Sequence, residues 1–290
     1  MNARIVIITT TFITLISCDF RKSVYKDLKT GMLSKGDGLS CEDVYLSWGE
    51  KKIERNTFIY GEEVVLNLNN IEGFERVDGH AFPGMDLWVT DEQGDTLLKK
   101  HDLYAGLQSG TALSPLLLKA NVMVADPIHS GGKYTLDVRV WDKKSDGIFN
   151  VTLGFEVVAN DQIAIESDQT NFREIYLYSQ ERQQVITNNR AGFNENIYMM
   201  FEGLEGYAVE NNAVSIGLSI EVEDASGKLL VNERDLIGED LFGYSEFHSQ
   251  MAASFILTGS HVQNPVQYEV FIWDKKGDGT IRATTQLHIE

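Results

Sequence analysis

The chain has few cysteines, few prolines and few basic residues. Its 290 residues include 2 cysteines, 4 prolines, and 25 Lys and Arg against 43 Asp and Glu, for a formal net charge of −18. Two cysteines cannot build a disulfide framework, and four prolines exclude a long, stiff proline-rich spacer. Such an acidic chain is repelled by nucleic acid and by anionic headgroups, so we expect no nucleic-acid binding and no attachment through a basic patch.

The common motifs of catalysis are missing as well. No metal-ligand spacing, Gly-x-Ser-x-Gly elbow, phosphate-binding loop or dinucleotide fingerprint is present. Cys41 has no histidine close to it in sequence that would lower its pKa, so we expect a buried or linker thiol. We therefore expect a protein that is not an enzyme and holds no cofactor. Paired carboxylates for glycoside hydrolysis stay open, because a sequence does not show proximity in space. The histidines are His80, His101, His129, His248, His261 and His288.

The N-terminus carries an apolar run that follows Arg4 and ends in Leu15-Ile16-Ser17-Cys18. The run is shorter than the roughly 20 residues of a membrane-spanning helix. Its basic start, apolar middle and small residue before the cysteine are typical of a secretory signal. The last four residues resemble the lipobox of bacterial lipoproteins, a resemblance that covers the signal region only. It implies removal of residues 1–17 and lipidation of Cys18. An ordinary signal peptide with an incidental cysteine, or an uncleaved anchor, is the alternative.

The same resemblance implies a location. Several acyl chains on Cys18 would anchor the protein on an envelope membrane, whereas a single chain would hold it only weakly. Asp19 favours the inner membrane in enteric bacteria, a rule that other lineages do not follow. Residues 19–25 lack the acidic run that resembles a surface-export tag. We therefore expect a protein of the bacterial cell envelope that faces the periplasm, and of the two membranes we expect the outer one.

The rest of the chain is an internal duplication. Gly206 follows Gly73 by 133 residues and Trp273 follows Trp141 by 132 residues, each inside a matching segment. This nearly constant offset indicates two tandem copies of one domain. The matching segments are 71–74 with 204–207, 91–94 with 224–227, 102–103 with 235–236, and 141–147 with 273–279.

Short runs of alternating apolar and polar residues fill both copies. Period two between Gly, Asp and Asn breaks is typical of half-buried antiparallel strands. About seven strands per copy favour an all-β fold of two tandem immunoglobulin-like antiparallel β-sandwiches over residues 43–158 and 163–290. Residues 18–42, with three glycines, are expected to be a lipidated N-terminus and flexible tether. The expected strands are 43–48, 62–70, 85–91, 95–101, 115–124, 133–142 and 149–158, then 174–179, 195–203, 216–223, 227–234, 250–258, 267–274 and 281–289.

The repeated Trp-Asp-Lys-Lys-x-Asp-Gly block resembles the start of a calcium loop of the EF-hand type. Lys144 and Lys276 stand where a ligand oxygen is needed, and Leu153 and Thr285 where a bidentate glutamate belongs, which excludes an EF-hand. A β-hairpin with a positive-φ glycine and an aspartate that binds backbone N–H groups explains the block. A calcium site of another kind stays open, with the candidate ligands Asp142 and Asp146 or Asp274 and Asp278.

Exposed aromatic residues and divergent loops are the candidate binding surfaces. Trp88 is expected on the outer face of a strand, with Ser219 in its place in the second copy. It could stack on a sugar ring or pack against the other domain. The copies differ most over 104–132 and 237–266. We expect a lipid-anchored envelope scaffold that contacts a protein partner through strand edges and these loops. The alternative is a glycan-binding lipoprotein that uses Trp88, Tyr104 or Phe242.

Overall fold

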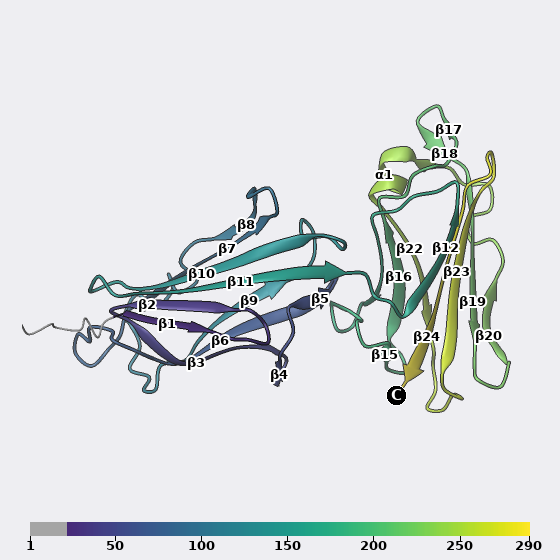
Figure 1. Cartoon of the computed structure of the whole chain (residues 1–290). Helices are drawn as coiled ribbons and strands as arrows, with labels where there is room; N and C mark the ends of the chain where they lie inside the picture. Colours follow the sequence, from purple (N-terminus) through teal and green to yellow (C-terminus); the bar gives the residue numbers. More distant parts are fainter. Residues whose placement is uncertain (1–21) are drawn as a thin grey trace, which may run out of the picture.

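The computed structural model describes residues 22–290, which form two β-sandwiches with separate cores (Figure 1). The first core contains buried residues from Met32 to Val157, and the second contains those from Ile163 to Ile289. In the long strands every second residue is buried, as in Leu118–Met123. The predicted fold of two tandem immunoglobulin-like sandwiches is therefore confirmed. No helix within 22–290 has the length and apolar character needed to cross a bilayer.

Domain 1 packs a seven-stranded sheet against a four-stranded sheet. The larger sheet has the order β1-β2-β11-β10-β7-β8, with β5 parallel to β11, and the smaller has the order β4-β3-β6-β9. The bounds are β1 (Lys22–Lys26), β2 (Leu33–Asp37), β3 (Ser40–Trp48), β4 (Lys51–Ile53), β5 (Thr57–Ile59), β6 (Glu63–Glu72), β7 (Pro83–Asp91), β8 (Thr96–Lys100), β9 (Leu118–Met123), β10 (Lys133–Asp142) and β11 (Ile148–Val158).

Domain 2 repeats this plan with a six-stranded sheet, β12-β24-β23-β19-β20 with β15 on β24, packed on a four-stranded sheet, β14-β13-β16-β22. A small sheet and one short helix, α1 (Tyr244–Ser249), cover one end. The bounds are β12 (Ile163–Asp168), β13 (Glu174–Ser179), β14 (Gln184–Val185), β15 (Arg190–Ala191), β16 (Asn196–Glu202), β17 (Val209–Glu210), β18 (Ala213–Val214), β19 (Ile216–Glu223), β20 (Leu229–Glu233), β21 (Phe242–Gly243), β22 (Gln250–Ile256), β23 (Val266–Asp274) and β24 (Thr280–Ile289).

The prediction of a flexible tether over 18–42 was wrong for the part that the structure describes. β1 and β2 form a hairpin, and β2 pairs with β11 of the domain 1 sheet. Met32 and Leu39 are 2% and 1% exposed within the core, and such burial fixes the segment in place. Residues from 22 onward therefore belong to domain 1. The predicted signal peptide, 1–17, and the predicted lipidation site, Cys18, lie outside the described residues.

One of the two tyrosines at the start of the penultimate strands forms a tyrosine corner. The Tyr134 hydroxyl accepts from the His129 amide and donates to the His129 carbonyl, both at 2.9 Å. Tyr268 is fully buried, and its hydroxyl donates instead to the Ala253 carbonyl on β22, at 2.7 Å. The corner is thus a feature of domain 1, while Tyr268 ties the two sheets of domain 2 together.

Candidate functional site

The repeated aspartates close the same structural link in both domains. The Asp142 carboxylate accepts from the amides of Glu75 and Lys144 at 2.7 and 3.0 Å and from the Ser145 hydroxyl at 2.7 Å. Asp274 accepts from the amides of Ala208 and Lys276 at 2.6 and 2.8 Å. Each buried carboxylate therefore joins the hairpin of its block to a distant loop, 73–75 or 206–208. Asp142 and Asp274 are 3% and 7% exposed.

The hairpin interpretation of the block is confirmed, with one correction. β10 and β11, like β23 and β24, are antiparallel neighbours joined at this block. The positive-φ glycine was wrong, because Gly147 and Gly279 do not have positive φ. The aspartate hydrogen bonds shape the turn instead. Asp146 and Asp278 are exposed at the hairpin tips, and no cluster of three or more possible metal-ligand residues is found within 22–290.

The other repeated segments also hold the fold together. Lys143 pairs with Asp102 and Lys275 pairs with Asp235, both at 2.7 Å. The Asp91 carboxylate accepts amides in the β7–β8 turn, as Asp224 does in the β19–β20 turn. These contacts account for most of the sequence that the copies share. The residues that differ between the copies are therefore the better guide to a binding site.

The repeated tryptophans lie on the outer faces of their sheets, each one residue before the end of its strand, β10 or β23. Trp141 pairs with Gly84 on β7, and Trp273 pairs with Gly217 on β19. A Cβ atom at either glycine would lie 2.2 or 2.0 Å from an indole carbon, so each ring lies directly over a glycine. This shared pairing sets the alignment of the two faces. In this alignment the residue of domain 2 that is equivalent to Trp88 is Glu221, not Ser219. The alignment expected from the sequence was therefore wrong by two residues.

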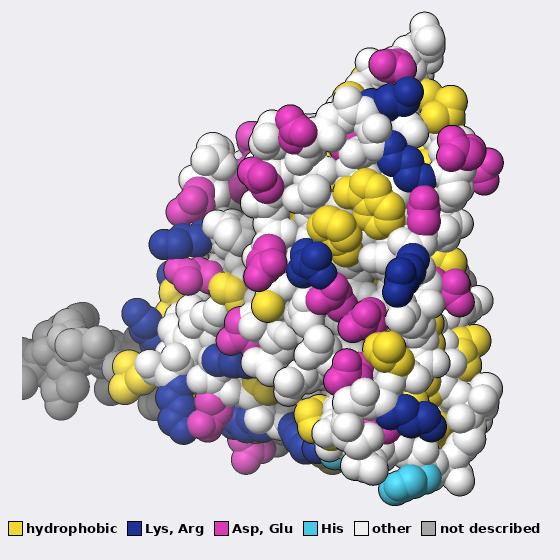
Figure 2. All heavy atoms as spheres, turned by 90° about the vertical axis from the view of Figure 1, so that its right-hand side faces the viewer, with side chains coloured by type: hydrophobic (Ala, Val, Ile, Leu, Met, Phe, Trp, Pro, Cys, Tyr) yellow, Lys and Arg dark blue, Asp and Glu magenta, His cyan; other side chains and the backbone are white. Residues whose placement is uncertain are grey.

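The outer face of domain 2 carries an open groove beside Trp273. Figure 2 shows this side of domain 2, where an apolar patch is bordered by acidic and basic side chains. The groove has a volume of about 710 Å³ and runs between β20 and β23. Its floor is low because β19 presents Ser219 there, a residue with a short side chain. Polar walls come from Glu221, Asn232, Arg234, Glu269 and Asp278.

Two aromatic rings form one wall of this groove, and a guanidinium lies over one of them. The rings of Phe271 and Trp273 lie with centroids 5.5 Å apart and planes at 23°. Arg282, opposite Phe271 on β24, holds its guanidinium 4.4 Å from the Phe271 centroid and pairs with Glu269. A guanidinium over a ring face is a favourable cation–π contact. The side chains of one sheet face thus form a preassembled aromatic and charged surface.

Two carboxylates face each other across β19 and β23. Glu221 and Glu269 are direct cross-strand partners on the outer face. Glu269 is paired with Arg282, whereas Glu221 has no ion-pair partner within the described residues. Like charges directly opposite in a sheet are destabilising. The folded domain therefore keeps an unfavourable pair at the edge of its groove.

In domain 1 the corresponding groove is filled. Asp86 stands at the position of Ser219, and its carboxylate binds the His101 ring at 2.7 Å. That ring stacks on Trp141, with centroids 6.0 Å apart and planes at 19°. Trp88 occupies the position of Glu221 and lies half-buried between Asp137 and Lys99. The face that is open in domain 2 is thus occupied by side chains of domain 1 itself.

The three aromatic residues singled out in the sequence are not brought together. Trp88 lies on β7 of the seven-stranded sheet. The Tyr104 hydroxyl is held by the backbone of Lys119 on the opposite, four-stranded sheet, and burial raises the Tyr104 pKa. Phe242 lies in the small end sheet of domain 2. Tyr104 has a packing role. The divergent segments 104–132 and 237–266 include β9, α1 and β22, away from the groove.

Sequence reasoning overlooked Phe271 and Arg282, although a signal was present. The predicted hairpin closes at Trp273 and Thr280, and antiparallel counting from that pair places Phe271 opposite Arg282. Cys41 is a half-buried thiol whose pKa is raised by burial to about 11, which suits the expected structural role.

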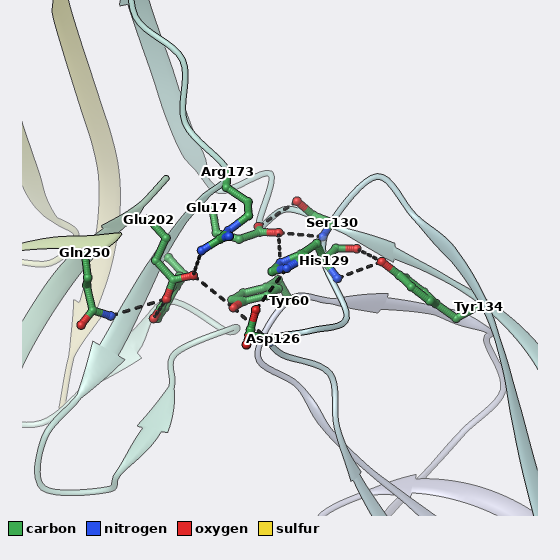
Figure 3. A network of polar contacts seen from close by, with 10 residues as sticks. Tyr60, Asp126, His129, Ser130, Tyr134, Arg173, Glu174, Glu202 and Gln250 are labelled. Atoms are coloured by element: carbon green, nitrogen blue, oxygen red, sulfur yellow. Dashed lines mark hydrogen bonds and ion pairs between the residues drawn. The ribbon is translucent and has the colours of Figure 1, made fainter. Parts of the chain in front are cut away.

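A polar network joins the two domains near the C-terminal end of β11, the last strand of domain 1 (Figure 3). The Glu174 side chain is 1% exposed and accepts from the Ser130 amide and hydroxyl at 2.7 and 2.8 Å. Burial raises the pKa of Glu174, despite these hydrogen bonds, which lower it. The rings of Tyr60 and Tyr176 meet at 5.3 Å, and the Tyr176 hydroxyl donates to Glu202 at 2.7 Å. These contacts restrict motion between the sandwiches.

Comparisons with known proteins reach the fold and no further. No family model and no curated protein matches the chain. Dimeric latent PorU from Porphyromonas gingivalis is similar at 12% identity and TM-score 0.26, over 87% of this chain and 20% of that one. Fibronectin(III)-like modules of Clostridium thermocellum CbhA are similar at 8% identity and TM-score 0.20, over 81% and 89%. The chain thus spans about a fifth of the first of these structures. At such values the likeness carries no argument about activity.

Proposed function

We propose that the protein is a non-catalytic binding protein of the bacterial envelope, anchored by a lipid on Cys18, that holds a protein partner in the groove of domain 2. The anchor rests on the lipobox resemblance, and the periplasm-facing side of the outer membrane remains the proposed location. The candidate surface for a ligand is this aromatic groove, whose lining contains no arrangement of a nucleophile and a base.

One observation carries the proposal: the same groove is filled in domain 1 and open in domain 2. Domain 1 covers its tryptophan with the Asp86–His101 pair, whereas domain 2 has Ser219 there and leaves Trp273 beside an open groove. Tryptophan and arginine are among the residues that dominate the binding energy of protein interfaces, and the half-buried Trp273 and the exposed Arg234 both line this recess.

The test is crosslinking and co-purification of the full-length lipidated protein from its native envelope, followed by mass spectrometry. Phe271→Ala should abolish recovery of a stoichiometric partner, because it removes half of the aromatic wall. The matched control is Arg139→Ala, the corresponding outer-face position of domain 1, which should leave recovery unchanged. Equal recovery with Phe271→Ala would show that the groove is not the binding surface.

A glycan is the second candidate, and the orientation of Trp273 favours it. An indole that lies flat over a glycine, with hydroxyl, amide and carboxylate groups of Ser219, Asn232 and Glu221 nearby, suits a sugar ring. In this case Phe271→Ala should weaken retention on an envelope glycan that the wild type binds. Trp88→Ala should not, since Trp88 lies on the other domain. Retention lost with Trp88→Ala alone would instead favour the platform expected from the sequence.

A further inference from the structure

We infer that the groove of domain 2 takes up a cationic side chain, arginine or lysine, from a basic segment of the protein partner. This inference rests on the proposed function and specifies the chemistry of the partner. It depends on three features of the outer face: an internal guanidinium site, its vacant mirror position, and carboxylates that have no cation.

The internal site shows what this surface holds well. Arg282 lies over one side of Phe271 and is neutralised by Glu269, so an aromatic face and a carboxylate together bind a guanidinium. The three residues Ser219, Phe271 and Arg282 form one row across the sheet. Arg282 therefore covers Phe271 from the β24 side, and Trp273 stacks on Phe271 along β23. The cross-strand partner of Phe271 on β19 is the short Ser219 side chain.

The mirror position above Ser219 has its own carboxylate. Glu221 is two residues from Ser219 on the same face, in the row that also contains Glu269. A guanidinium above Ser219 would contact Phe271 and reach Glu221, as Arg282 contacts Phe271 and reaches Glu269. It would also relieve the repulsion between the two glutamates. The cation of the ligand would thus contact Phe271 and Glu221 as Arg282 contacts Phe271 and Glu269.

The charge around the groove points the same way. Glu221, Glu233 and Asp278 line it and have no ion-pair partner within the described residues, while Arg234 is the one basic residue of the lining. The whole chain has a net charge of −18. In domain 1, Arg139 stands at the position of Phe271, so the aromatic ring that would receive a cation is absent from that face. The combination of an aromatic ring and carboxylates without a cation therefore favours a basic partner for domain 2.

The experiment measures binding of two short peptides to the full-length protein in detergent micelles by isothermal titration at low salt. One peptide is acetyl-Gly-Arg-Gly-Arg-Gly-amide. The other has citrulline at both arginine positions, which keeps the shape and removes the charge. We expect the arginine peptide to bind at least about tenfold more tightly, and Glu221→Gln to reduce its affinity about tenfold. Asp146→Asn, which changes the net charge equally on domain 1, should leave affinity unchanged.

Three results would overturn the inference: equal affinity of both peptides, no effect of Glu221→Gln, or no detectable binding of the arginine peptide. Tighter binding of a glucosamine oligomer than of the arginine peptide would assign the cation to a glycan and also overturn it. None of these depends on the partner-capture assay with Phe271→Ala. A protein that captures its partner through Phe271 yet ignores peptide charge would keep the proposed function and lose only this inference.

Discussion

The outer faces of the two large sheets share a set of structural contacts but differ in the residues around the repeated tryptophan. Both domains place a tryptophan over a glycine, bury an aspartate under a hairpin and pair a lysine with an aspartate at 2.7 Å. Around the tryptophan, domain 1 has Asp86, Trp88 and His101 where domain 2 has Ser219, Glu221 and Arg234. The first set of residues stabilises the fold in both copies, and the two outer faces differ in the second set.

The largest effect is expected from the shared aspartates. Asp142→Ala leaves the amides of Glu75 and Lys144 without their acceptor and should lower the free energy of unfolding by about 2–4 kcal/mol. Asp274→Ala should cost somewhat less, because Asp274 accepts from two donors and Asp142 from three. Urea denaturation, followed by probes specific to each domain, measures both.

Asp146→Ala is the control for this comparison, because its exposed side chain should change stability by no more than about 0.5 kcal/mol. A loss at Asp142 no larger than that at Asp146 would contradict the structural role of the buried carboxylate.

The next effect separates stability from binding. Gly84→Ala and Gly217→Ala each place a methyl group inside an indole and should cost about 1–3 kcal/mol in their own domains. Partner capture should be lost with Gly217→Ala alone, because it displaces Trp273 from the groove. Thermal melts and the capture assay together test this. Loss of capture by Gly84→Ala would place the binding surface on domain 1.

Converting one face into the other should change binding with little loss of stability. Ser219→Asp, Glu221→Trp and Arg234→His together give domain 2 the residues that fill domain 1. We expect capture to fall at least about tenfold, about 1.4 kcal/mol, with a native circular dichroism spectrum. Retained capture by this folded variant would mean that the open groove is not what the partner recognises.

The junction should respond to pH through Glu174. Burial raises the pKa of this carboxyl above its usual value of 4.5. The folded state therefore holds its proton more tightly, so this contribution to stability is full below pH 4.5 and is lost as pH rises through the raised pKa. Glu174→Gln should remove that part of the pH dependence. Melting temperatures measured from pH 4 to 8 that have the same slope in both proteins would contradict this.

The smallest effect concerns Glu221. Glu221→Gln removes the cross-strand repulsion with Glu269 and should stabilise domain 2 by about 0.2–1 kcal/mol. A thermal melt measures the gain. Asp146→Asn, with the same change in charge on domain 1, should show none. Destabilisation by Glu221→Gln would mean that the carboxylate supports the fold rather than serving a ligand.

Sequence patterns located the long strands because one face of each is buried, so that alternation is visible. The sequence did not predict β1 because all five of its residues are exposed. It did not predict β2 because the inward-facing residues of that strand are Ser34 and Gly36, which are not apolar. The groove escaped for a different reason. It arises beside the short Ser219 side chain and from residues on three strands, β19, β20 and β23. Trp273 and the block around it were evident as a repeat, but nothing in their order along the chain shows which residues cover them.

The hairpin of β1 and β2 has a mechanical consequence for the proposed anchoring. Because β1 belongs to the domain 1 sheet from Lys22 onward, at most three residues separate Cys18 from that strand. Four chain steps of at most about 3.6 Å allow roughly 14 Å between a lipidated cysteine and the first strand. The network around Glu174 limits movement between the two sandwiches. The anchored protein would therefore behave as one rigid unit held close to the membrane surface. Its groove would then sample a thin layer at a set height above the membrane, and a partner would have to present its basic segment within that layer.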